Sequence, residues 1–183
     1  MLKRVLLAGL IAGVISGLFM YFTAAQTSAE EMMSTNMLQM MAAGYASMLI
    51  ALAFIFIAIK RQRDIAQGGV IKFPPAFGMG LAITLVAGII YALAWEASLV
   101  LTDYNFIGAY EAMLMSLVDN SGKTGEELEA YRASMLASME AYKNPVSRLP
   151  MTFMEIAPVG VLVSLVSALL LRNSRFLPHK PVV

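Results

Sequence analysis

The sequence contains no cysteine and a single histidine in 183 residues. Without cysteine the chain cannot form disulfides, thiolate metal sites or a thiol nucleophile. The lone histidine, His179, stands in the C-terminal tail without a partner for metal or base chemistry, so a solvated side chain is expected. No serine, histidine and aspartate set is recognisable, and no cofactor is predicted. An enzyme is therefore not expected.

Charged residues are also scarce. They make up 14% of the chain, while hydrophobic residues make up 59%. A soluble domain of this size needs more charge on its surface. The net charge of +1 gives no reason to expect a nucleic acid or a strongly acidic partner. This composition predicts a membrane protein whose first partner is the lipid bilayer.

Long hydrophobic runs are what the chain has in place of charge. Four of them can cross about 30 Å of hydrocarbon as helices. Each span must be helical, because lipid offers no partner for backbone groups and the alternation of a barrel strand is missing. The predicted fold class is an all-α polytopic membrane protein with one domain over residues 1–183. The spans are predicted at about 5–25, 37–59, 76–101 and 149–171, with an outer helical loop at 103–148 and a tail at 172–183.

Basic residues gather on one side of this topology. They precede the first span, lie between the second and third, and follow the fourth. Acidic residues dominate the other side, chiefly in the outer loop. The positive-inside rule therefore places both termini in the cytoplasm. The cations on this side are Lys3, Arg4, Lys60, Arg61, Arg63, Lys72, Arg172, Arg175 and Lys180.

The first span also fits another interpretation. MLKR, the apolar run and FTAAQTSAEE together match a signal peptide cleaved near Ala29. The apolar stretch is longer than a usual signal core, and its glycines favour helix packing. We therefore predict a retained span, which sequencing of the mature amino terminus would test.

Small residues recur at four-residue spacing in the spans. That spacing forms a groove on one helix face, where another backbone can approach closely. Helix packing explains this pattern better than a substrate path, so a tight four-helix bundle is predicted. The predicted packing glycines are Gly9, Gly13, Gly17, Gly80, Gly88 and Gly160.

The loop between the second and third spans combines a basic cluster, a Gly-Gly turn and the pair Pro74–Pro75. Proline is favoured in the first turn of a helix, so the pair marks the start of the third span. We expect the cluster, Lys60, Arg61 and Arg63, to meet anionic headgroups at the membrane surface.

The outer loop has helical periodicity. Apolar residues follow one helix face within Phe106–Val118 and another within Leu128–Tyr142. Thr124 and Glu127 match a capping box for the second helix, and Asn144–Pro145 ends it. The loop therefore predicts an amphipathic helical hairpin that covers the bundle or docks a partner.

Three stretches carry a family resemblance: AFIFIAIKRQRDIAQGGVIKFPPAFGMG, DYNF and MEIAPVGVLVSLVSALLL. Through them the chain resembles the bacterial membrane family described as domain of unknown function 4199. The likeness runs from the first span to about Arg175 and is most specific in the basic loop. It implies a bacterial inner-membrane location and four spans. It implies no activity and no catalytic residues.

Glu96 and Glu155 are carboxylates inside predicted spans. Each lies about five residues, or about 8 Å, from the nearest hydrocarbon edge. Antiparallel third and fourth spans place both at a similar depth near the outer face. Two ionised acids at close range repel, so one of them is expected to hold its proton. The pair therefore predicts a proton- or cation-binding site.

A second interpretation, which we favour, assigns these acids to the membrane boundary. In a regular helix Glu155 points away from the small-residue face, and it reaches the bundle interior only if Pro158 kinks or unwinds the preceding turn. Otherwise Glu155 lies at headgroup level, bonded to outer-loop groups such as Arg148. Tyr91 and Trp95, near Glu96, are expected to be interfacial anchors.

Methionine is frequent, with 15 residues. The stretch EEMMSTNMLQMM places several thioethers, soft ligands suited to Cu(I), on successive helical turns. Adaptable packing of the outer helices is the commoner reason for such residues. The copper candidates are Met37, Met40 and Met41.

Two functions remain open at this point. The leading one is a structural or partner-binding component of the inner membrane. The alternative is a small proton- or cation-coupled carrier or channel subunit. Four spans are few for a transport pore, so the alternative predicts a homo-oligomer.

Overall fold

The computed structural model describes residues 1–26 and 37–178. Within these ranges all regular secondary structure is helical, as predicted. Ala29, His179 and Lys180 lie outside the described residues, as does the Met37 side chain. Four helices are long and apolar enough to cross a membrane: α1 (Leu2–Gln26), α3 (Met37–Arg61), α4 (Phe73–Leu101) and α7 (Pro145–Leu171).

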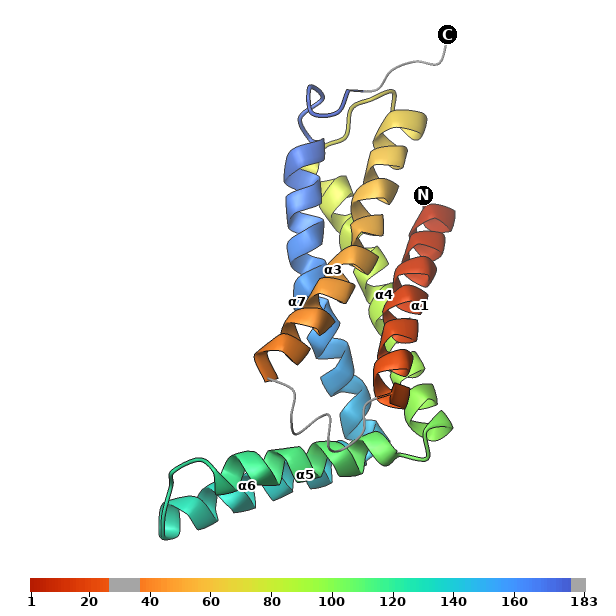
Figure 1. Cartoon of the computed structure of the whole chain (residues 1–183). Coiled ribbons are helices and arrows are strands. Elements are labelled where there is room, and N and C mark those ends of the chain that lie inside the picture. The colour runs from red at the N-terminus through yellow and green to blue at the C-terminus, as the bar shows by residue number, and fades with distance from the viewer. Residues whose placement is uncertain (27–36, 179–183) are drawn as a thin grey trace.

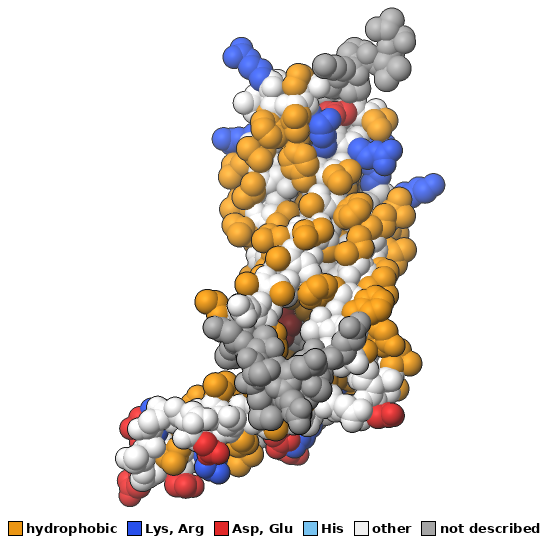
Figure 2. All heavy atoms as spheres, in the orientation of Figure 1, with side chains coloured by type: hydrophobic (Ala, Val, Ile, Leu, Met, Phe, Trp, Pro, Cys, Tyr) orange, Lys and Arg blue, Asp and Glu red, His pale blue; other side chains and the backbone are white. Residues whose placement is uncertain are grey.

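The four long helices form a bundle in which consecutive spans run in opposite directions (Figure 1). α1 packs against α3 and α4, and α7 packs against the same two helices. The start of α1, the α3–α4 connection and the end of α7 lie together at one end, which we call the basic end (Figure 1). Figure 2 shows Lys and Arg side chains gathered there, above a band of hydrophobic side chains.

The predicted packing glycines lie at helix–helix contacts. A Cβ added to Gly9 or Gly13 of α1 would lie 2.6 Å from the Cβ of Val86 or Ile90 on α4. Only a missing side chain permits so close an approach, so these positions bring α4 against α1. The remaining glycines pack in the same way: Gly17 against Ala94, Gly80 against Ser164, Gly88 against Phe153 and Gly160 against Thr84.

The π-helical turn η1 (Gln62–Ala66) continues α3 at the basic end. Its Arg63 is fully buried, so the expectation that this side chain meets headgroups is wrong. The carbonyl groups at the end of a helix lack partners within that helix. Arg63 donates to one such group, Leu171 O, at 3.5 Å. It also donates to two carbonyls of the segment that follows α7, at 2.9 Å to Phe176 O and 2.6 Å to Leu177 O.

The rest of the basic cluster divides in two. Lys60 is half-buried and pairs with Asp64 at 2.5 Å, whereas Arg61 is exposed, as the prediction of a membrane-surface residue requires. Pro74 and Pro75 stand in the first turn of α4, as predicted.

Two further helices, α5 (Asn105–Asp119) and α6 (Glu126–Lys143), form the predicted outer hairpin. It lies across the other end of the bundle, which we call the outer end, and extends sideways beyond it (Figure 1). Ile107, Met113 and Val118 of the predicted apolar face are buried. The hairpin is therefore amphipathic and anchored at one end.

The ends of α6 agree only partly with the prediction. The capping box is wrong, because Gly125 precedes the helix without a side-chain cap and Glu127 pairs instead with Lys123. Asn144 ends α6 as predicted. Its side chain also accepts a hydrogen bond from the Val146 backbone at 3.0 Å, so α7 begins earlier than the predicted span.

Candidate functional site at the outer end

An ion pair between a fully buried arginine and a partly buried acid joins two spans at the outer end. Arg148, in the first turns of α7, has no exposed surface. It donates from Nε to Oε1 of Glu96 at 2.7 Å and from Nη2 to Oε2 at 2.6 Å. This two-point geometry matches the planar guanidinium to the carboxylate and is the strong form of the interaction. Glu96 is thereby neutralised by α7.

The same arginine holds the end of the hairpin. Its Nη1 donates to the carbonyl oxygens of Tyr142 at 3.0 Å and Lys143 at 3.2 Å, which end α6. Its guanidinium also lies 5.7 Å from the ring centre of Tyr142 and 6.0 Å from that of Tyr104. A single side chain therefore ties α4, α6 and α7 together. We call Arg148, Glu96 and the end of α6 the outer clamp.

Aromatic side chains surround the outer clamp. Trp95 donates from Nε1 to the Tyr142 hydroxyl at 2.9 Å. Its ring meets that of Phe106 edge to face, with ring centres 4.9 Å apart. The ring centre of Tyr110 lies 6.0 Å from that of Phe106 and 6.2 Å from that of Tyr142. Burial raises the pKa of Tyr142 to about 12, and it also raises the pKa of Tyr110.

Tyr91 and Trp95 are not the interfacial anchors that the sequence predicted. They are 2% and 3% exposed, respectively, because they pack inside the bundle and under the hairpin. Aromatic side chains with a polar group are typical of headgroup anchors, but these two make contacts inside the protein.

Glu155 stands apart from the outer clamp. Its residue is exposed on α7, and its Oε2 accepts a long hydrogen bond of 3.4 Å from the hydroxyl of buried Tyr91 on α4. No Lys, Arg or His within the described ranges forms an ion pair with it. Between Arg148 and Glu155 on the same helix, the buried hydroxyl of Thr152 has no hydrogen-bond partner among the described residues. These are oxygen groups that could hold a proton or a small cation.

Two predictions about the acids are wrong in detail. Arg148 bonds to Glu96 and not to Glu155, so charge repulsion between the two acids gives no reason for either to hold a proton. The two acids also lie at different depths in the bundle. Glu155 bonds to Tyr91, which precedes Glu96 by five residues on α4, or about 7.5 Å along the helix axis.

Pro158 lies inside α7, which stays helical from Pro145 to Leu171. The turn before Pro158 is therefore not unwound. The kink predicted at Pro158 stays a prediction. The Glu155 side chain extends from an exposed position on α7 to the hydroxyl of Tyr91.

The methionine candidates do not form a described metal site. Met40 packs against the cluster of Ala109 and Met113 on α5, and Met41 is 47% exposed. The described residues also contain no group of three His, Cys, Asp or Glu side chains placed to hold a metal ion. Packing between α3 and α5 accounts for Met40, and copper binding stays a prediction.

The model of the family described as "Protein of unknown function (DUF4199)" matches residues 5–173. The chain belongs to this family. No curated protein and no solved structure matches it. The DUF4199 match extends over all four spans and the hairpin, so the outer clamp lies within the matched region.

The role of Arg148 was not recognised from the sequence as a partner of Glu96. The signal was present, because a lone arginine starts the fourth span and a lone acid lies near the end of the third. In antiparallel neighbours these two positions meet at one end. The tie from Arg148 to the end of α6 had no signal, because it depends on where the hairpin turns back.

Proposed function

We propose that this DUF4199 protein is a structural, partner-binding component of a bacterial inner membrane. Its basic end lies in the cytoplasm and its hairpin lies outside, and it carries out no catalysis. Four apolar helices support residence in a membrane. The concentration of Lys and Arg at the basic end supports this orientation, because such residues are retained on the cytoplasmic side.

The observation that carries this proposal is the clamped and projecting hairpin. The outer clamp fixes the end of α6 to α4 and α7, and α5 and α6 then extend past the bundle (Figure 1). A surface that only covered the bundle would not need to extend beyond it. A rigid projecting element loses little conformational freedom on binding, which favours its use as a docking platform.

One face of α6 suits this role. Glu129, Ala133, Leu136 and Glu140 recur at helical spacing and are all exposed, Leu136 by 44%. Glu129 and Glu140 have no ion-pair partner among the described residues. We call these four residues the α6 outer face. An apolar centre between two acids fits a partner helix that has an apolar stripe flanked by basic residues.

The test places a photo-cross-linking amino acid at Leu136 in the full chain, in living cells of the source bacterium. A matched control carries it at Leu117, which is 43% exposed on α5. A discrete product is expected at Leu136 and not at Leu117, and it should disappear with Glu129→Lys/Glu140→Lys. A product at twice the mass of the chain would identify a second copy as the partner. Absence of any product at Leu136 would reject this function.

A second function is favoured by one observation, namely that the carboxylate of Glu155 has no cationic partner among the described residues. With the hydroxyls of Tyr91 and Thr152 it offers oxygen ligands at the α4–α7 contact. Such a group within a span binds protons or monovalent cations in carriers and channels. We propose Glu155, and no longer Glu96, as the residue that would serve a small proton- or cation-coupled carrier or channel subunit.

Flux into proteoliposomes tests this second function. Glu155→Gln should abolish proton or sodium flux, whereas Thr23→Ala, on α1 and not on either helix of the site, should leave it unchanged. Flux at the level of empty liposomes in the wild-type protein would reject transport. Unchanged flux in Glu155→Gln would reject the assignment of the site.

A further inference from the structure

A groove runs between α1 and α3 at the basic end, away from the outer clamp. Its volume is about 340 Å³. Buried Ala8 and Ala58 form its floor, one from each helix. Two alanines facing each other leave a gap that larger side chains would fill, so the groove follows from the sequence of both helices.

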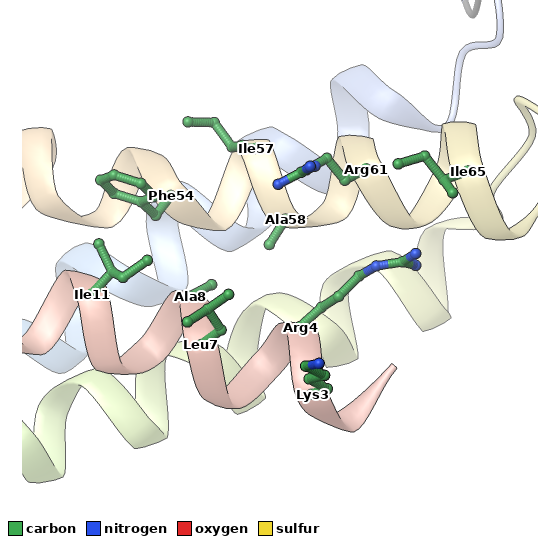
Figure 3. A pocket seen from close by; sticks show the side chains of 10 residues that line it. All are labelled: Lys3, Arg4, Leu7, Ala8, Ile11, Phe54, Ile57, Ala58, Arg61 and Ile65. Atoms are coloured by element: carbon green, nitrogen blue, oxygen red, sulfur yellow. The ribbon is translucent and has the colours of Figure 1, made fainter. Parts of the chain in front are cut away.

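The groove has two chemically different parts. Towards the middle of the bundle its walls are apolar and include Leu7, Ile11, Phe54 and Ile57. Towards the basic end it carries Lys3, Arg4 and Arg61 (Figure 3). A long apolar slot with cations at one end matches a molecule that has a hydrocarbon chain and an anionic head.

In the part of the chain that the structure describes, the three cations lack acidic partners. Within the described residues no Asp or Glu forms an ion pair with Lys3, Arg4 or Arg61. Arg4 donates to the neutral side chain of Gln62 at 2.5 Å. Asp64, the nearby acid, is instead held by Lys60 and Arg63. The groove mouth therefore keeps uncompensated positive charge, while the adjoining Lys60 and Arg63 share the single carboxylate of Asp64.

From this arrangement we propose that the groove binds one anionic phospholipid of the leaflet at the basic end. The phosphate lies among Arg4, Arg61 and Lys3, where guanidinium groups can donate paired hydrogen bonds to it. One acyl chain lies along Leu7, Ile11, Phe54 and Ile57 against the alanine floor. Basic pockets between membrane helices recognise anionic headgroups by this combination.

The geometry sets the depth of the lipid. Arg61 ends α3 and Lys3 lies in the first turn of α1, so the cations stand where two helices meet the headgroup layer. Ile11 and Phe54 lie about two turns deeper along their helices, or about 11 Å, which is the direction an acyl chain takes into the bilayer. Charge and apolar surface are thus in the order that a phospholipid presents them.

Native mass spectrometry of the full chain, released from a neutral detergent, tests the proposal. Dioleoylphosphatidylglycerol is the anionic probe, and dioleoylphosphatidylcholine and inorganic phosphate are the comparison probes. We expect phosphatidylglycerol to bind in a one-to-one complex more tightly than phosphatidylcholine, and phosphate alone not to displace it. Equal binding of the two lipids, or displacement by phosphate, would overturn the proposal.

Charge-removing variants locate the site. Each cation near an anionic headgroup contributes roughly a factor of five in affinity, so Arg4→Gln/Arg61→Gln should weaken phosphatidylglycerol binding roughly 25-fold. The matched control is Lys72→Gln, an exposed cation at the same end of the molecule and not among the residues that line the groove. It should change binding less than twofold. An equal effect of the two variants would show general surface attraction and reject the groove.

A variant that keeps the charge tests the apolar part, and a single variant guards against loss of folding. Ala58→Leu fills the floor and should weaken binding of phosphatidylglycerol without changing the net charge. Should the double arginine variant fail to fold, Arg61→Gln, at an exposed position, should still weaken binding roughly fivefold. Full retention of binding in both Ala58→Leu and Arg61→Gln would contradict the proposal.

Discussion

The two ends of the bundle each contain a fully buried arginine, Arg63 at the basic end and Arg148 at the outer end. Both donate to backbone carbonyl groups at or just beyond the end of a helix, and each joins segments that are distant along the chain. At the outer end these carbonyls are the ones that end α6, which that helix leaves unpaired. At the basic end they are Leu171 O and two carbonyls of the segment after α7.

The ends differ in the source of the compensating acid. At the basic end the acid is Asp64, the next residue in the chain, and Lys60 also pairs with it. At the outer end the acid is Glu96, from another span, and Arg148 is its ion-pair partner among the described residues. Loss of the arginine therefore leaves a partly buried acid without its ion-pair partner at the outer end and not at the basic end.

The largest effect is expected from Arg148→Met. Removing one partner of a buried ion pair leaves Glu96 uncompensated, so the free energy of unfolding should fall by about 3–5 kcal/mol. Reversible unfolding in mixed micelles measures this loss. Arg132→Gln is the control, because its pair with Asp119 is exposed. The double variant Glu96→Leu/Arg148→Met should recover part of the stability, since it leaves no unpaired charge.

A smaller loss is expected from Arg63→Met. Asp64 keeps its pair with Lys60, so what is lost is mainly the hydrogen bonds to Phe176 and Leu177, about 2 kcal/mol. Hydrogen exchange should then increase at the end of α7 and in the segment after it, while the hairpin stays protected. The neighbouring variant Arg61→Met should change neither the free energy of unfolding nor the hydrogen exchange at the end of α7. A loss as large as that of Arg148→Met would contradict the comparison.

Trp95→Phe should have a smaller effect again. It removes the hydrogen bond to the Tyr142 hydroxyl but keeps most of the buried ring, which is expected to cost about 1 kcal/mol. The loss should appear as faster hydrogen exchange in α6 and not at the basic end. Trp95→Phe in a Tyr142→Phe background should cost less, because the partner is already absent.

The pH dependence of the outer end follows from the same tyrosine. Burial raises the pKa of Tyr142 from 10.0 to about 12. A folded pKa above the unfolded one means that this contribution to stability is fully present below pH 10 and is lost as the pH rises towards 12. Tyrosinate absorbance, with Tyr142→Phe as reference, measures the shift. Ionisation of this group at an ordinary tyrosine pKa would contradict its packing against Trp95 of α4.

The smallest effect is expected from Lys123→Gln. Its ion pair with Glu127 is solvent-exposed, so the change in unfolding free energy should be below about 0.5 kcal/mol. Added salt should weaken the other exposed ion pairs of the hairpin but not the outer clamp. A large loss would indicate that the hairpin tip supports the fold, against its projecting position.

Much of the architecture was predictable from residue patterns. The four spans follow from long apolar runs, and the glycine positions at helix contacts follow from their four-residue spacing. Asn144–Pro145 correctly separated α6 from α7, because proline cannot continue a helix whose backbone needs its N–H. The capping box at Thr124 is wrong, since Gly125 occupies the cap position and Glu127 pairs with Lys123 instead.

The site was less predictable, as the two acids show. Sequence position identified Glu96 and Glu155 as unusual charges in hydrocarbon, but it did not distinguish them. Their distinction depends on Arg148, whose guanidinium reaches Glu96 from a different helix. Arg63 shows the same limit of sequence reasoning. A basic residue beside a span predicts a contact with headgroups, and the sequence does not reveal that carbonyls at and after the end of α7 bind this side chain instead.

Residue order alone determined that this chain is a four-span helical membrane protein, because hydrocarbon thickness and the lack of backbone partners in lipid permit little else. Tertiary structure decided which charges are neutralised, which remain available and where the hairpin projects. Those outcomes depend on side chains meeting across helices that are far apart in sequence, and on distances of a few ångströms that no local pattern encodes.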